Sequence, residues 1–192
     1  MAAVRPVSLV SVTLTQVAVF LLGPLNLILL CSLHDYAPGD KKILSRIGLC
    51  CIIATMALGN QMYFVHFNVM RLIASKGALT GLEQFVEWNP NSAAVASGLL
   101  AWAFFGGMAL LCVAPIFSGG RLERRLRYTS LVCGSCAILG SLGFLLDITV
   151  LMLVYILASL VAGTTLYVLE SLLFRRLVNE APLKVPLPES VR

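Results

Sequence analysis

Long apolar stretches separated by short polar segments form the main pattern of this chain. Roughly 20 apolar residues in helical form cross the hydrocarbon core of a bilayer, and by this measure the pattern predicts five membrane-spanning helices. The predicted fold class is therefore all-α, a polytopic transmembrane helical bundle. The predicted spans cover residues 9–33, 47–67, 93–117, 128–146 and 148–174.

The last two spans form one almost uninterrupted apolar region. Between residues 128 and 174 the charged residues are Asp147 and Glu170. One helix of about 46 residues would be roughly 70 Å long, more than twice the hydrocarbon thickness. We therefore predict a tight hairpin, with Asp147 capping its turn. Glu170 is expected to pair with the region of Arg175 and Arg176.

The connection from Asn68 to Ser92 carries apolar residues at helical spacing. This spacing predicts a short amphipathic helix that ends at Trp88 and lies on the membrane surface. Its apolar positions are Leu79, Leu82, Phe85 and Val86, with Glu83 and Glu87 between and beside them.

The end of the chain differs in composition from the rest. Residues 177–192 have no apolar period and contain Pro182, Pro186 and Pro188, a pattern typical of disorder. We therefore predict one transmembrane domain over residues 1–176, followed by a disordered cytoplasmic tail over 177–192.

Composition agrees with the spanning pattern. Of the 192 residues, 59% are hydrophobic and 12% charged, and the mean hydropathy is +0.92. A soluble domain is about half apolar and a quarter charged, so the lipid bilayer is the expected partner. The net charge of +5 comes from basic residues beside the apolar runs, where they normally set topology. No nucleic-acid partner is expected.

The basic residues alternate in density from one connection to the next, which predicts the orientation. Eleven of the fourteen Lys and Arg fall on one side of the five spans and three on the other. Because Lys and Arg accumulate in cytoplasmic connections, we predict an outside N-terminus and a cytoplasmic C-terminus, in the cell membrane. The eleven are Lys41, Lys42, Arg46, Arg121, Arg124, Arg125, Arg127, Arg175, Arg176, Lys184 and Arg192; the three are Arg5, Arg71 and Lys76.

A polar cluster ends the second span and is the candidate substrate-binding site. Polar side chains cannot face lipid unpaired, so they either bond to neighbouring helices or line a wet cavity. The cluster consists of Asn60, Gln61, Tyr63, His66 and Asn68. In the first span, Pro24 follows Gly23 and precedes Asn26, which predicts a bend or, as in some transporters, a broken helix at a substrate site.

The cysteines are the candidate metal ligands. All six lie near the predicted cytoplasmic ends of their spans, a placement that argues for reduced thiols rather than disulfides. Thiolates could bind a soft metal such as Cu(I), or the cysteines could serve as small apolar residues for packing. The candidate metal set is Cys50, Cys51, Cys133 and Cys136. No cofactor is expected.

Small residues recur at four-residue spacing in the third and fourth spans. They occur at Ala94 and Gly98, at Ala103 and Gly107, and at Cys136 and Gly140. Such spacing lets helix backbones approach closely and predicts helix packing, while a narrow pore is the alternative.

Three segments resemble a family of small multi-pass prokaryotic membrane proteins of uncharacterised function. They are Phe85 to Ser92, Leu110 to Phe117 and Gly119 to Arg124, within a similarity that covers about Tyr63 to Arg127. The resemblance implies a bacterial or archaeal cytoplasmic membrane. It implies no activity and no functional residues.

Three functions follow from these patterns. The first is a non-enzymatic helical bundle that acts as a subunit, regulator or scaffold, as a homo-oligomer or with other membrane subunits. The second is a small-solute transporter or channel with a polar site near the outer end of the second span. The third is a thiol or metal-binding membrane protein. No catalytic residues are expected, because the sequence has no nucleophile with a base and no phosphate loop.

Overall fold

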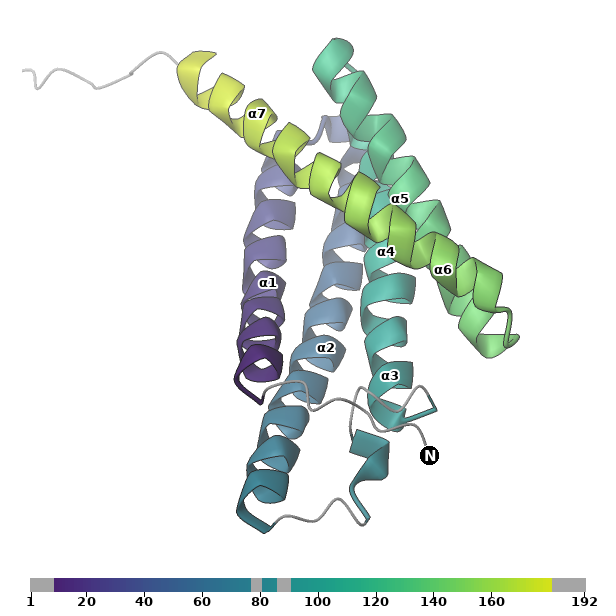
Figure 1. Cartoon of the computed structure of the whole chain (residues 1–192). Coiled ribbons are helices and arrows are strands. Elements are labelled where there is room, and N and C mark those ends of the chain that lie inside the picture. The colour runs from purple at the N-terminus through teal and green to yellow at the C-terminus, as the bar shows by residue number, and fades with distance from the viewer. Residues whose placement is uncertain (1–8, 77–80, 86–90, 181–192) are drawn as a thin grey trace, which may run out of the picture.

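A computed structural model describes residues 9–76, 81–85 and 91–180, and these residues are almost entirely helical (Figure 1). Five of its helical segments are long and apolar enough to cross a membrane, which confirms the predicted number. They cover Leu14–Tyr36, Gly39–Ile73, Ala93–Ile116, Arg121–Leu145 and Thr149–Glu180.

The first two spans form an antiparallel pair. Helix α1 (Leu9–Tyr36) is followed by the 3₁₀ turn η1 (Gly39–Lys41) and helix α2 (Lys42–Lys76). Helix α2 is longer than the predicted span at both ends, because helical hydrogen bonding continues past the apolar run where no Gly or Pro interrupts it. Residues 68–76, predicted to begin a connection, therefore belong to α2.

The connection after α2 is described in part. Residues 83–85 form the 3₁₀ turn η2 (Glu83–Phe85), and residues 77–80 and 86–90, which include most of the predicted surface helix, lie outside the described residues.

The third span contains a change of helix type. It runs through α3 (Ala93–Gly98), the π-helical segment η3 (Leu99–Phe105), α4 (Gly106–Val113) and the 3₁₀ turn η4 (Ala114–Ile116). Ser92 caps its start, because the Ser92 hydroxyl accepts a hydrogen bond of 3.2 Å from the backbone N–H of Val95.

The last two spans form the predicted hairpin. Helix α5 (Arg121–Leu145) is followed by α6 (Thr149–Ala158), the π-helical segment η5 (Ser159–Gly163) and α7 (Thr164–Glu180). At the turn, Asp147 has a φ of 55°, and the backbone N–H of Ile148 donates to the carbonyl of Gly143 at 2.7 Å. This is the Schellman arrangement that ends many helices, so the turn predicted at Asp147 is confirmed.

Two helix ends extend past the predicted boundaries. Helix α5 begins seven residues before the predicted span, at Arg121, because its basic first turns continue the helix beyond the apolar run. Helix α7 includes residues 177–180, which were predicted to be disordered. The Arg176–Glu180 ion pair, 2.6 Å from Nε to Oε1, spans one helical turn there. Residues 181–192 lie outside the described residues.

Glycines allow the closest helix approaches. A Cβ added to Gly107 would lie 3.0 Å from the Cβ of Ala137, and one added to Gly140 would lie 2.3 Å from the Cβ of Tyr155. These contacts join α4 to α5 and α5 to α6. The packing predicted from the small-residue spacing is confirmed at Gly107 and Gly140.

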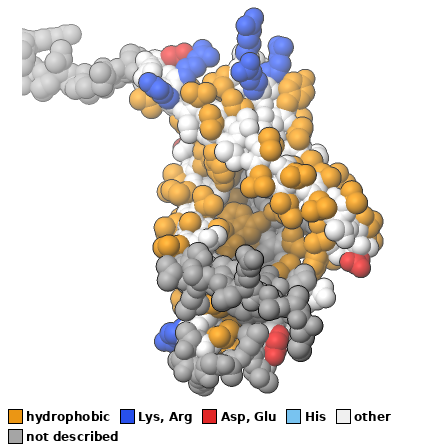
Figure 2. Space-filling model, viewed as in Figure 1, with side chains coloured by type: hydrophobic (Ala, Val, Ile, Leu, Met, Phe, Trp, Pro, Cys, Tyr) orange, Lys and Arg blue, Asp and Glu red, His pale blue; other side chains and the backbone are white. Residues whose placement is uncertain are grey.

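The last span is the least buried part of the bundle. It crosses the other helices diagonally in Figure 1, and 6% of its most apolar window is buried, against 17–39% in the other four spans. Figure 2 shows Lys and Arg gathered at the end of the molecule where α7 ends, above a broad hydrophobic surface. The same figure shows a recess with hydrophobic walls between α1 and the α6 end of the last span.

Candidate functional site

The five polar residues predicted as a substrate site do not converge. Gln61 and Asn68 are exposed, whereas Tyr63 and His66 are buried on another side of α2. Asn60 faces α1, where its Oδ1 would lie 2.9 Å from a Cβ on Gly23.

Two members of this set bond locally. The Nδ1 of His66 lies 3.1 Å from the backbone carbonyl of Phe85 in η2. Asn68 accepts a hydrogen bond of 3.0 Å from Arg71 on the same helix. One of these bonds lies within α2 and the other reaches the connection after it, and the substrate site predicted for this cluster stays a prediction.

The candidate metal ligands lie on two helices. Cys50 is exposed on α2 and Cys51 is partly buried, while Cys133 is buried and Cys136 partly buried on α5. Within the described ranges, no three His, Cys, Asp or Glu side chains are grouped as a metal site requires. The thiol site stays a prediction without a gathered ligand set.

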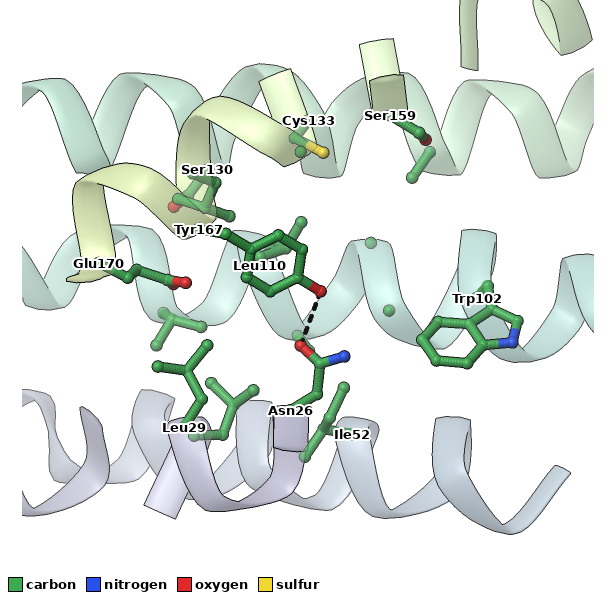
Figure 3. A pocket seen from close by; sticks show the side chains of 18 of the residues that line it. Asn26, Leu29, Ile52, Trp102, Leu110, Ser130, Cys133, Ser159, Tyr167 and Glu170 are labelled. Atoms are coloured by element: carbon green, nitrogen blue, oxygen red, sulfur yellow. Dashed lines mark hydrogen bonds between the residues drawn. The ribbon is translucent and has the colours of Figure 1, made fainter. Parts of the chain in front are cut away.

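One cavity lies between the helices of the bundle. Its volume is about 210 Å³, and residues from all five spans line it. Most of the lining is apolar, and Figure 3 shows a few polar side chains among these residues. The lining consists of Asn26, Leu29, Leu30, Ile52, Trp102, Gly106, Gly107, Ala109, Leu110, Val113, Phe117, Ser130, Cys133, Ala137, Tyr155, Ser159, Gly163, Leu166, Tyr167 and Glu170.

Two π-helical segments and the proline position of the continuous helix α1 lie at this cavity. Asn26 follows the Pro24 position of α1, Trp102 lies in the π-helical η3, and Ser159 and Gly163 lie at the two ends of the π-helical η5. A proline or a π-helical turn breaks the regular hydrogen-bond ladder and shifts the helix locally, and such breaks often accompany functional sites. All three positions therefore contribute to the wall of one cavity.

A hydrogen-bonded pair crosses the cavity from the first span to the last. The Tyr167 hydroxyl of α7 donates to Asn26 Oδ1 of α1 at 3.0 Å (Figure 3). The Asn26 Nδ2 donates in turn to the carbonyl of Leu22 at 2.9 Å. The pair therefore uses the Tyr167 proton and one Asn26 proton within the protein.

Glu170 provides the acidic group of the cavity. It is 5% exposed, and its Oε2 is buried without a hydrogen-bond partner among the described residues. The predicted pairing with the Arg175 and Arg176 region is not observed, because Arg176 pairs with Glu180 instead. In Figure 3, Glu170 and Trp102 lie on opposite sides of the Asn26–Tyr167 pair.

Glu170, Tyr167 and Trp102 are cavity residues that the sequence pattern did not predict. The signal that could have found Glu170 is the rule that an ionisable residue within a membrane span faces the interior or a cavity. The cations five and six residues away offered a simpler partner, and that partner was preferred. For Trp102 no sequence signal announces a π-helical segment.

No family model, curated protein or solved structure matches this chain. The fold defines the class, an all-helical bundle whose five longest apolar helices could each cross a membrane. The predicted resemblance to a prokaryotic family stays a prediction.

Proposed function

We propose that this chain is an integral membrane protein that binds a small, mainly apolar molecule in the cavity between its spans. The observation that carries the proposal is an apolar cavity of about 210 Å³ with a buried, unpartnered carboxylate oxygen of Glu170 on its wall.

The proposed orientation has the N-terminus outside and the C-terminus in the cytoplasm of the cell. It is supported by the gathering of Lys and Arg at the end of the bundle where α7 ends (Figure 2). Basic side chains are retained on the cytoplasmic side during insertion. Exposed apolar residues cover the flank between the two ends, as expected for contact with lipid.

The cavity has room for a ligand. An engineered apolar cavity of about 150 Å³ binds benzene, so one of about 210 Å³ accommodates one aromatic ring and a short chain. Interiors are normally close-packed, and an unfilled cavity of this size costs stability. A scaffold or subunit role requires neither the cavity nor the buried acid, so the structure favours ligand binding over that role.

The proposal is tested by filling the cavity. Leu166 is buried and lines the cavity, while Leu172 on the same helix is exposed. We expect 2-phenylethanol to raise the melting temperature of the wild-type protein in dodecyl maltoside. Leu166→Trp should abolish this shift because the indole occupies the cavity, and Leu172→Trp should retain it.

The readout is the melting temperature over a series of 2-phenylethanol concentrations, with the detergent concentration held constant. A shift of equal size in Leu166→Trp and Leu172→Trp would mean that the alcohol acts through the micelle. That result, or the absence of a shift in the wild type, contradicts the proposal.

A further inference from the structure

We infer that the ligand of this cavity is a lipophilic ammonium ion, an apolar molecule with one protonated amine, and that Glu170 is its counter-ion. The inference rests on the proposed function, since it names the ligand class of the same cavity.

Some polar groups named in the cavity already have a hydrogen-bond partner within the protein. The Tyr167 hydroxyl is donated to Asn26, and an Asn26 N–H is donated to Leu22. Two described residues of the cavity wall have a buried polar atom without a partner. The Nε1 of Trp102 packs against α2, where a Cβ on Gly59 would lie 3.0 Å from it, and the Oε2 of Glu170 is an acceptor in its ionised form. A complementary ligand therefore brings a donor to Glu170.

The charge of Glu170 is the second feature that limits the ligand. A buried carboxylate is costly unless it is paired. Within residues 9–76, 81–85 and 91–180, the ion pair found is Arg176–Glu180, so no described basic side chain neutralises Glu170. A cationic donor supplies the missing charge, and hydrogen bonds to a charged group are about twice as strong as neutral ones.

The residues around Glu170 favour an organic cation over a metal ion. Calcium takes six to eight oxygen ligands, and transition metals take several His, Cys or carboxylate ligands. The described residues contain no group of three such side chains, and the cavity walls around Glu170 include Leu166, Leu29 and Leu110. An ion that enters this site must bring its own apolar body.

The positions of Glu170 and Trp102 define the orientation of the ligand. Glu170 lies on one side of the Asn26–Tyr167 pair and the Trp102 indole on the other (Figure 3). The ammonium group binds at Glu170, and the apolar body extends toward Trp102, where an aromatic ring of the ligand gains favourable ring contacts.

The experiment compares two probes of the same size, 2-phenylethylamine and 2-phenylethanol. Both have one ring and a two-carbon chain, and they differ in the ammonium or hydroxyl group. Binding is measured by calorimetry to the full chain in dodecyl maltoside, a non-ionic detergent that does not attract the amine by charge. We expect the amine to bind about tenfold more tightly to the wild-type protein, the effect of one charge-assisted hydrogen bond.

Two variants locate the preference. Glu170→Gln keeps the shape of the side chain and removes its charge, so it should lose the preference for the amine and keep binding of the alcohol. Glu180→Gln removes an exposed acid from the same helix, outside the cavity, and should keep the full preference.

The outcomes separate the inference from the proposed function. Equal affinity for the two probes in the wild type, or an amine preference that persists in Glu170→Gln, overturns the inference and leaves the cavity as a binding site. Failure of both probes to bind overturns the proposed function as well. The wild-type comparison needs no variant, so it decides the question even where Glu170→Gln does not fold.

Discussion

Individual polar residues determine which ligands the cavity can bind. The apolar side chains that form most of its wall do not distinguish one apolar ligand from another. Asn26 and Tyr167 form a hydrogen bond between the first and last spans. Glu170 follows Tyr167 by slightly less than one helical turn in α7. The spacing of 141 residues between the two partners of the hydrogen bond cannot be read from a local pattern. The Pro24 interruption was visible in the sequence; the residue that faces Asn26 was not.

Removing the Tyr167 hydroxyl should loosen the contact between these spans. Tyr167→Phe leaves Asn26 Oδ1 without its partner, and Asn26 is buried. We expect the free energy of unfolding to fall by about 1 kcal/mol, the usual worth of an interhelical hydrogen bond in a membrane protein.

The measurement is unfolding by sodium dodecyl sulfate in mixed micelles. Tyr128→Phe is the matched control, since Tyr128 is exposed on α5 and its hydroxyl should contribute nothing. An unchanged stability in Tyr167→Phe would show that water or lipid replaces the bond at no cost.

At the scale of elements, the apolar pattern predicts where helices exist but not how regular they are. The spans and the Asp147 turn were predicted because length, charge and hairpin geometry each constrain them. Helix ends were misplaced at Lys42, Arg121 and Glu180, because polar residues continue a helix into water without any apolar signal. The π-helical segments η3 and η5 arise from packing between distant helices, so they could not be predicted.

The α5–α6 hairpin depends on a glycine contact. A Cβ at Gly140 would lie 2.3 Å from the Cβ of Tyr155, closer than two carbons can approach, so Gly140→Ala must push α6 away from α5. We expect a loss of about 1–3 kcal/mol, the range of overpacking in a core.

Gly163→Ala is the comparison, because a Cβ there meets nothing within 4 Å. It should leave stability unchanged or raise it by up to about 1 kcal/mol, since alanine favours helix over glycine. Both variants are compared by the same detergent unfolding assay. Equal stabilities for the two would mean that α6 accommodates the methyl group by sliding.

The whole molecule combines a predictable bundle with an unpredictable interior. The number of spans follows from hydropathy alone, because lipid leaves few alternatives to a helix for an apolar segment. The candidate site had no such constraint. Five polar residues on one helix suggested a cluster, yet a helix turns about 100° per residue, and its neighbours decided which of them became buried.

Orientation is checked by labelling introduced cysteines in intact cells with a membrane-impermeant maleimide. Glu83 and Ser118 are exposed and lie in opposite connections. Under the proposed topology, Glu83→Cys reacts from outside, and Ser118→Cys reacts once the cells are permeabilised. The reverse pattern would contradict the proposed orientation. Recovery of the chain in the soluble fraction would contradict the proposed membrane placement.

The recess beside α1 has a consequence for how a ligand reaches the protein. It interrupts the apolar flank of the molecule (Figure 2), so under the proposed membrane placement a ligand would reach it from among the acyl chains rather than from water. Occupancy of the protein then depends on the mole fraction of the ligand in the bilayer. This mole fraction rises with the oil–water partition coefficient of the ligand. Adding empty vesicles at a fixed total amount of ligand lowers this mole fraction, so the bound fraction of the protein should fall although the total ligand concentration of the sample is almost unchanged.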